Sequence, residues 1–269
     1  MSRLEDAFKG CGRTAFIGYL VAGDPTPDES VIIARHLLAC GVDILEIGIP
    51  FSDPVADGPT LQKANERALC AGATPETAFA MSRTLRHGSD APLVLMTYAN
   101  IVYHRGIDRF YAEAQSAGID GILIVDMPLE EAEPALNAAC REDIDQIFLI
   151  APTTSPARIA RIAAAAAGYV YVVSTPGVTG VRGQLPKGVP GTLDAIRRCT
   201  SIPLAVGFGI STPAQVHALC AAGANGIIIG SAFADIIERR QTEPEKLYEE
   251  IRHFTKTIRA AIPGALGDC

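Results

Sequence analysis

The feature that most constrains the fold of this chain is a repeated alternation of short apolar runs with longer amphipathic stretches. Two of the apolar runs, GILIV and GIIIG, hold no polar residue where a half-buried strand would alternate. Strands of this composition are covered on both faces, as in parallel sheets flanked by crossover helices. We interpret eight runs as strands, namely Ala15–Val21, Val42–Ile47, Leu93–Thr97, Gly121–Val125, Gln146–Ile150, Tyr169–Val173, Leu204–Val206 and Gly226–Ile229.

Helical patterns lie between the strands, and their ends carry the residues that helix ends favour. Pro stands at the expected first position of two helices, after Ser155 and after Thr212, where its missing N–H has no helical partner to lose. Gly follows the expected helix ends in ACG, SAG and AAG, where a left-handed residue closes a helix. The clearest helical patterns are Pro27–Cys40, Thr60–Ala71, Ile107–Ala117, Ser155–Ala167, Pro213–Ala222 and a closing helix at Pro244–Ala261.

Eight strand–helix units without a strand-only block predict a closed (β/α)8 barrel, the TIM barrel. The 269 residues of the chain suit a barrel of about 250 residues. An open doubly wound sheet is the alternative, but no G-x-G-x-x-G follows the first strand. Because no linker divides the chain, we expect one α/β domain over residues 1–269. The stretch before the first strand is short, so a helix across the barrel bottom would be brief.

The composition of the chain limits its binding partners and its cellular location. The formal net charge of -7 argues against nucleic acid and anionic membranes, since both attract basic surfaces. No apolar stretch reaches the ~20 residues of a membrane span, and the charged start MSRLEDAFKG is unlike a signal peptide. The 7 Cys form no C-x-x-C pair, so we expect buried, reduced thiols and a cytoplasmic protein.

In such a barrel the active residues come from the carboxyl ends of the strands and the loops that follow them. The segment from 46 to 59 carries Glu46, Asp53 and Asp57. Glu46 stands between apolar neighbours in its predicted strand, and the predicted strands contain no Lys or Arg to pair with it. A lone buried carboxylate has a raised pKa and exchanges protons near neutrality. Position alone favours turn roles for Asp53 and Asp57.

Two further segments stand at strand ends. The Gly-rich stretch 174–188 follows the sixth strand and has the character of a mobile lid. Tyr171, just before it, is either a core residue or a hydroxyl for a ligand. GFGIS at 207–211 and GS at 230–231 follow the last two strands, where barrels often bind phosphate at the start of a short helix. Here residues 231–237 would form that helix.

The residue types narrow the chemistry. A Schiff-base aldolase needs a Lys at the barrel mouth, but no Lys stands at a predicted strand end. The 5 His lie on or beside predicted helices, which disfavours a clustered metal site. We therefore expect a site with neither metal nor cofactor, built from one or two carboxylates and a phosphate cradle. Such a site suits proton transfer on a substrate that carries its own electron sink.

The segment LEIGIPFSDPVADGP, at Leu45–Pro59, closely resembles the signature of the tryptophan synthase α chain family. LVAGDP, TYANIVY, VDMPLEE, APTTS, PGVTG, GFGIS and GSA resemble further segments of the family, in the same order along nearly the whole chain. The resemblance implies a TIM barrel that cleaves indole-3-glycerol phosphate to indole and glyceraldehyde 3-phosphate, a retro-aldol reaction of L-tryptophan biosynthesis. The indole ring, once protonated at C3, is the electron sink of this reaction.

The resemblance also implies roles for individual residues. Glu46 would be the acid–base group, and Asp57 would bond the indole N–H and stabilise the developing positive charge. Tyr171 resembles the tyrosine near the catalytic glutamate, and Thr179 resembles the lid threonine that meets the loop after the second strand. Further pocket residues implied by the resemblance are Tyr19 and Met96 at the indole, and Gly180, Phe208, Gly209, Gly230 and Ser231 at the phosphate.

The family works as an α2β2 assembly with a β chain that uses pyridoxal phosphate and receives indole through a tunnel. The resemblance therefore implies a β chain as partner, pyridoxal phosphate in that partner, and no cofactor in this chain. The segments that resemble the family's β-chain contacts are Pro50–Asp57, Thr97–Tyr103 and the start of the helix after Asp126. Thr175 departs from the basic residue that some members carry near this position.

Other functions stay open from the sequence. The long signature at Leu45–Pro59 argues against another phosphate-binding barrel such as an epimerase. A free-standing indole-glycerol phosphate lyase would share the whole set of motifs. A catalytically silent subunit that activates a β partner is the alternative from another class, and the presence of both Glu46 and Asp57 argues against it.

Overall fold

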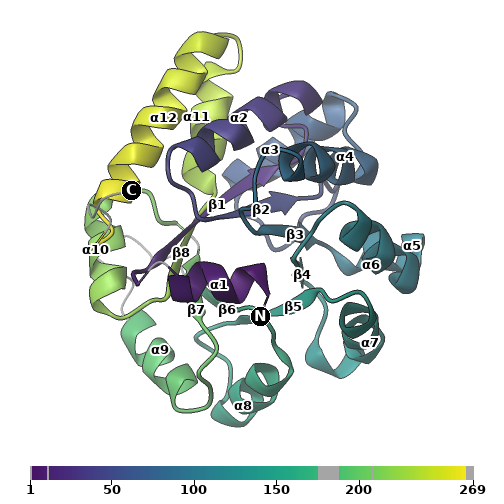
Figure 1. Cartoon of the computed structure of the whole chain (residues 1–269), viewed down its shortest axis with the longest axis vertical. Helices are drawn as coiled ribbons and strands as arrows, with labels where there is room; N and C mark the ends of the chain where they lie inside the picture. The colour runs from purple at the N-terminus through teal and green to yellow at the C-terminus, as the bar shows by residue number, and fades with distance from the viewer. Residues whose placement is uncertain (1, 11, 175–187, 208, 265–269) are drawn as a thin grey trace.

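The computed structural model describes residues 2–10, 12–174, 188–207 and 209–264. Its strands are parallel and close into a barrel in chain order, with β1 paired to β8. The expected (β/α)8 barrel is therefore confirmed. In Figure 1 the helices form a ring around the strands, and α1 is drawn across the middle of that ring. The strands are β1 (Ala15–Val21), β2 (Ile44–Gly48), β3 (Leu93–Thr97), β4 (Gly121–Ile124), β5 (Asp145–Ile150), β6 (Val170–Val173), β7 (Leu204–Gly207) and β8 (Gly226–Ile229).

The helices follow the strands in the expected alternation. They are α1 (Arg3–Gly10), α2 (Pro27–Ala39), α3 (Pro59–Cys70), α4 (Pro75–Arg86), α5 (Ala99–Arg105), α6 (Ile107–Ser116), η1 (Leu129–Glu131), α7 (Glu133–Arg141), α8 (Pro156–Ala165), α9 (Val189–Arg197), α10 (Pro213–Ala221), α11 (Ser231–Arg240) and α12 (Pro244–Ala260). α1 is the brief helix expected before the first strand. α11 continues to Arg240, beyond the short helix expected at 231–237.

Apart from the end of α11, element ends differ from the sequence prediction by no more than two residues, a normal margin at helix and strand termini. The largest difference among the strands is at β2, which begins at Ile44 and not at Val42. The Val42 N–H donates to the Leu37 carbonyl oxygen at 3.1 Å. Val42 thus belongs to the turn that closes α2, although its apolar side chain resembles the start of a strand.

Each strand contributes to two separate apolar cores. Alternate side chains, such as Ile17 and Ile44, fill the inside of the barrel. The side chains between them, such as Phe16 and Leu45, pack outward against the helices. Because side chains of a strand alternate in direction, this arrangement explains why most strand positions are apolar on both faces. A polar residue inside the barrel is therefore an exception that needs a partner or a function.

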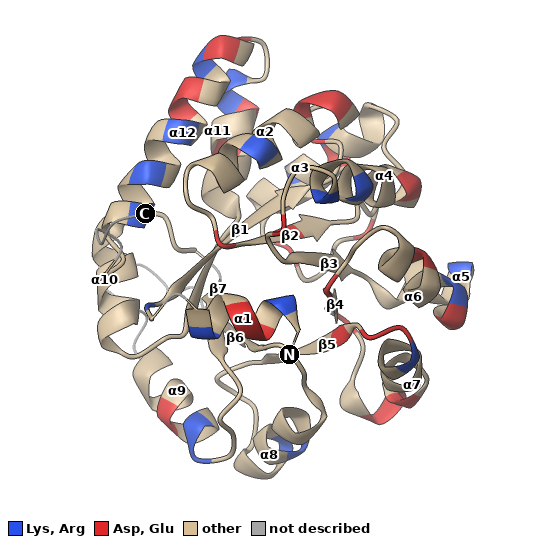
Figure 2. Ribbon diagram, in the orientation of Figure 1, with Lys and Arg blue, Asp and Glu red and all other residues tan. Residues whose placement is uncertain are grey.

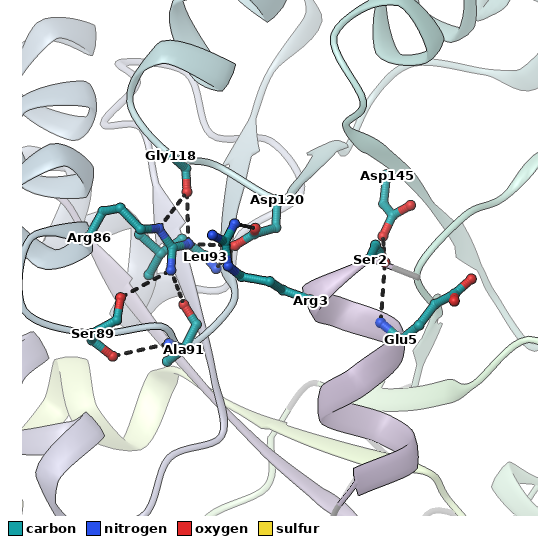
Figure 3. Close-up of polar contacts among 10 residues, drawn as sticks. All are labelled: Ser2, Arg3, Glu5, Arg86, Ser89, Ala91, Leu93, Gly118, Asp120 and Asp145. Carbon is teal, nitrogen blue, oxygen red and sulfur yellow. Dashed lines mark hydrogen bonds and ion pairs between the residues drawn. The ribbon is translucent and has the colours of Figure 1, made fainter.

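Charged side chains hold the amino-terminal end of the barrel together. The Asp120 carboxylate accepts from Arg86 at 2.6 Å, from Arg3 at 2.9 Å and from the Leu93 N–H at 2.8 Å, as Figure 3 shows. Figure 2 shows that most other charges lie on the outer helices and the loops. This end of the barrel is thus fixed by ion pairs, which leaves the carboxyl ends of the strands for a binding site.

The described cysteines correct one expectation. Their thiols are free, but none of them is buried: Cys40 and Cys220 are half-buried, and Cys70, Cys140 and Cys199 are exposed. Several stand at or beyond helix ends, as Cys70 does on α3, away from the apolar stripe that faces the sheet. In the described part of the chain, no helix is both long and apolar enough to cross a bilayer.

We expect Asp120→Ala to lower the free energy of unfolding by about 3 kcal/mol, because it leaves Arg86 in a half-buried position without its counter-charge. Arg3→Ala is the matched control on the same carboxylate. The Arg3 side chain is 52 % exposed, so its loss should cost less than about 1 kcal/mol. Urea unfolding of the three proteins measures both changes, and equal losses would contradict this account of the ion pairs.

Candidate active site

A cavity of about 780 Å³ opens at the carboxyl ends of the strands, the size of a site for a small molecule. Its wall is mostly apolar and includes Leu123, Leu149 and Ile228. The predicted site residues that the structure brings together in this wall are Tyr19, Glu46, Asp57, Met96, Tyr171, Gly209, Gly230 and Ser231. The predicted site residues that lie outside the described residues are Thr179, Gly180 and Phe208.

Glu46 points from the middle of β2 into the barrel and is 0 % exposed. In the sheet register it stands beside Tyr19 of β1 and Val94 of β3. The Tyr169 hydroxyl donates a hydrogen bond to Glu46 Oε1. Glu46 Oε2 has no hydrogen-bond partner among the described residues. One carboxyl oxygen is thus held by the protein, and the other is left for a group in the cavity.

The surroundings of Glu46 tune its acidity. Burial raises the pKa of this carboxyl from its ordinary value of 4.5 to about 7, and the hydrogen bond from Tyr169 opposes part of the rise. A charged partner such as Arg would have stabilised the ionised form, whereas a tyrosine hydroxyl does so weakly. A carboxyl with this pKa can both give and take a proton near neutral pH.

Asp57 lies in the loop between β2 and α3 and is 7 % exposed. The Asn65 side-chain amide donates to Asp57 Oδ2 at 3.2 Å, and the same side chain accepts from the Phe51 N–H at 3.0 Å. Burial raises the pKa of the Asp57 carboxyl to about 6, while hydrogen bonds from Tyr98 and Asn65 lower it. The Asp57 carboxyl therefore lines the cavity and is held by Asn65, while the Asp57 N–H closes a turn by donating to the Pro54 carbonyl oxygen at 2.9 Å.

Two tyrosines and their glycine neighbours shape the floor of the cavity. A Cβ atom at Gly207 would overlap the Tyr171 hydroxyl, and one at Gly48 would overlap the Tyr19 hydroxyl. A side chain at Gly230 would also meet the Tyr19 ring, at 2.6 Å. Glycine is thus required at these three strand ends so that the tyrosine rings fit inside the barrel. Burial and the nearby carboxyls raise the pKa of both tyrosines, so their hydroxyls stay protonated.

The other end of the cavity has the features of an anion site. Gly230 and Ser231 stand at the start of α11, and both line the cavity together with Gly209. The first N–H groups of a helix have no partner within it and point toward a bound anion. Gly209 has a φ of +70°, which glycine adopts without strain. These residues thus contribute backbone to the cavity wall at the start of α11.

Sequence reasoning missed three residues that hold the carboxylates, namely Tyr169, Asn65 and Tyr98. Tyr169 stands two positions before Tyr171, so the alternation along β6 places both on the inner face. That spacing was a signal for a second tyrosine in the site. Asn65 and Tyr98 reach Asp57 from other elements, and no local pattern marks them. Tyr171 remains in the cavity, but the hydroxyl bonded to Glu46 comes from Tyr169.

The raised pKa of Glu46 predicts a pH-dependent stability. The unfolded chain releases this proton near its ordinary pKa of 4.5, but the folded protein holds it to about 7, so the folded state loses stability as the pH rises between these values. Glu46→Gln escapes this loss, and its stability relative to the parent protein should increase by about 3 kcal/mol from pH ~4 to pH ~8.

Unfolding by urea across this pH range measures the difference between the two proteins. Glu249→Gln, on the exposed side of α12, is the control and should show no such trend. A constant difference between Glu46→Gln and the parent protein would show that Glu46 titrates alike in the folded and unfolded states.

Comparison with known proteins agrees with this geometry. The family model described as "Tryptophan synthase alpha chain" matches residues 6–263. The tryptophan synthase alpha chain of Methanoregula boonei is 48% identical over 261 residues, which cover 97% of this chain and 98% of that protein. The corresponding protein of Methanothermobacter thermautotrophicus is 42% identical and covers 95% of this chain, with 95% of its own length matched.

Solved structures agree as well. A chain from the tryptophan synthase α2β2 complex of Pyrococcus furiosus superposes with a TM-score of 0.87 at 38% identity, covering 92% of this chain and 98% of that one. A structure from Aquifex aeolicus superposes with a TM-score of 0.88 at 33% identity, covering 97% of this chain and 99% of that one. The match extends over the whole barrel and both sides of the cavity, and the chain belongs to the tryptophan synthase α chain family.

Proposed function

We propose that Glu46 and Asp57 carry out, in this chain, the reaction of the tryptophan synthase α chain family. That reaction is the cleavage of indole-3-glycerol phosphate to indole and glyceraldehyde 3-phosphate in tryptophan biosynthesis. The observation that carries the assignment is the position of Glu46, a buried carboxyl with one oxygen held by Tyr169 and the other without a partner among the described residues. The activity is that of the family, and the roles of Glu46 and Asp57 in it are the proposal.

The chemistry needs one group that gives a proton and then takes one. Protonated Glu46 donates its proton to C3 of the indole ring, which leaves a positive charge shared with the ring nitrogen. The bond between C3 and the glycerol side chain then breaks, and its electron pair returns to the ring. The Glu46 carboxylate takes the proton from the adjacent hydroxyl, which becomes the aldehyde. Glu46 ends as it began, and a pKa of about 7 suits both steps.

Asp57 would accept a hydrogen bond from the indole N–H and stabilise the positive charge on the ring. The Asn65 amide and the Tyr98 hydroxyl fix this carboxylate in place, so it needs no reorganisation during the reaction. The substrate phosphate would lie at the start of α11, near Gly230 and Ser231. The resting enzyme then needs Glu46 protonated and Asp57 ionised, which makes the basic limb of the pH profile report on Glu46.

We further propose that the chain works with a tryptophan synthase β chain as an α2β2 assembly. The Pyrococcus furiosus structure, which comes from such a complex, supports this. Val55 and Tyr103 stand on the segments expected to meet the partner and are 81% and 48% exposed. Pyridoxal phosphate would belong to the β chain, where it would supply the chemistry that consumes indole. The free thiols of the described cysteines agree with a cytoplasmic location.

Substitution of the two carboxylates tests their roles. Glu46→Gln should lower the rate of indole release by roughly 10³-fold, because it removes the acid–base group. Asp57→Asn should lower it by about 100-fold, because it weakens the stabilisation of the ring charge. Both variants should still bind a non-cleavable indole alkyl phosphate, measured by calorimetry. The exposed Glu249→Gln is the matched control, and normal turnover by Glu46→Gln would refute the role of Glu46.

The partner proposal has its own test. We expect the chain alone to release indole slowly, and a titrated tryptophan synthase β chain to raise that rate by roughly 10-fold or more, the usual range of coupling between sites. Val55→Asp should weaken this response without changing the slow basal rate, since Val55 is exposed in the free chain. Rapid release that the β chain leaves unchanged would indicate a free-standing lyase.

A further inference from the structure

Helix α1 is fastened to the bottom of the barrel at its first residues. Arg3 donates to Asp120 at 2.9 Å, and the Ser2 hydroxyl donates to Asp145 Oδ2 at 2.6 Å. Figure 3 shows these two carboxylates on either side of the helix start. Asp120 is itself held by Arg86, whose guanidinium also donates to the Gly118 carbonyl oxygen at 2.8 Å. The position of α1 is therefore set by groups that belong to the barrel.

Two apolar side chains of α1 enter the bottom of the barrel. Leu4 is 0% exposed, and a Cβ atom at Gly121 would approach its side chain to 2.8 Å. A Cβ atom at Gly226 would lie 3.1 Å from the Phe8 ring. Glycine at the starts of β4 and β8 thus leaves the space that these side chains fill. Leu4 belongs to the apolar cluster inside the barrel, which also contains Tyr169, and the partly buried Phe8 packs against that cluster.

The Phe8 ring packs against the ring of Tyr169. Their centroids are 5.6 Å apart and their planes are tilted by 53°, within the range of favourable aromatic pairs. Tyr169 is fully buried, and its hydroxyl donates to Glu46. A continuous set of contacts therefore leads from the helix on the closed end of the barrel to the carboxyl at its open end.

We propose that α1 is a positioning element of the active site, in which Phe8 fixes the Tyr169 ring so that its hydroxyl stays on Glu46. This inference rests on the proposed role of Glu46. Phe8 is not among the residues that line the cavity, so it would act through Tyr169. Its removal would leave the ring of Tyr169 free to move toward the vacated space, and the hydrogen bond to Glu46 would weaken.

The effect of Phe8 on the Tyr169–Glu46 hydrogen bond can be distinguished from an effect of charge on Glu46. The titratable groups that interact with it are Tyr169 and Tyr171 of the β6 region and Tyr19 of β1, and Asp57 of the following loop lines the same cavity. Phe8 is uncharged, so Phe8→Ala adds or removes no charge near Glu46. A rise in the pKa of Glu46 in this variant would therefore report the loss of the hydrogen bond, because water that entered the vacated space would lower the pKa instead.

The experiment compares Phe8→Ala, Tyr169→Phe and the double variant, each assembled with a tryptophan synthase β chain. Loss of the hydrogen bond raises the pKa of Glu46, so Tyr169→Phe should move the basic limb of kcat/KM upward by about one pH unit. Phe8→Ala should move it in the same direction by about half as much. The double variant should move it no further than Tyr169→Phe, because both act through one bond.

A second readout does not depend on turnover. The infrared band of the protonated Glu46 carboxyl, identified by its loss in Glu46→Gln, titrates directly with pH and should show the same order of shifts. Lys9→Ala is the matched control, since Lys9 lies on α1 with a 64% exposed side chain. It should leave both the kinetic limb and the infrared titration unchanged. If Phe8→Ala does not fold, Phe8→Leu keeps most of the volume and removes the flat ring.

The outcomes separate this inference from the proposed function. A lower melting temperature with an unshifted infrared titration in Phe8→Ala or Phe8→Leu would overturn the positioning role and leave α1 as a structural cap. Additive shifts in the double variant would also overturn it, because the two residues would then act independently. Normal turnover by Glu46→Gln would refute the catalytic role of Glu46, while the infrared titration would still decide whether Phe8 controls the bond.

Discussion

The burial of one carboxyl inside the barrel is the constraint on which the rest of the site depends. An ionised group in that position loses its hydration, and the interior must either neutralise it or provide partners for it. This chain uses a tyrosine hydroxyl on Glu46 in place of a cation. By contrast, Asp24 at the end of β1 is bound by Arg67 through two hydrogen bonds of 2.9 Å. In the first arrangement no cation opposes protonation, whereas in the second the Arg67 guanidinium opposes part of the rise that burial causes in the pKa of Asp24.

The tyrosines that accompany Glu46 determine much of the surrounding sequence. A barrel of eight strands has an interior just wide enough for its own side chains. Large rings at Tyr19 and Tyr171 are therefore possible because neighbouring strands end in Gly48, Gly207 and Gly230. Of these three glycines, Gly230 also lines the cavity, at the start of α11. Gly230 thus serves two regions at once, because it leaves space for the Tyr19 ring and stands where phosphate is expected to bind.

The sequence was sufficient for the barrel because its signals are local. Continuous apolar strands and glycine after each helix follow from burial on both faces and from helix termination. Glu46 was visible for the same reason, as the one acid in an apolar strand. The partners of Asp57 were not visible, because Asn65 and Tyr98 come from α3 and the end of β3 and meet only in the folded chain. The outward cysteines were misjudged because alanine-rich context does not tell which face of a helix a residue occupies.

The carboxylates at the amino-terminal end of the barrel have charged partners, whereas Glu46 has an uncharged one. At the amino-terminal end, Asp43 accepts from Arg13 and Arg259 at 2.9 Å, and Asp120 accepts from Arg86 and Arg3. Glu46, by contrast, accepts a hydrogen bond from the Tyr169 hydroxyl, and the Tyr169 ring packs against the Phe8 ring of α1. The ion pair between Arg3 and Asp120 holds the start of α1 in place although the Arg3 side chain is 52 % exposed. A carboxyl that must change its protonation state is better held by an uncharged tyrosine that is itself fixed from α1. A cation next to the carboxyl would lower its pKa and leave it ionised at neutral pH.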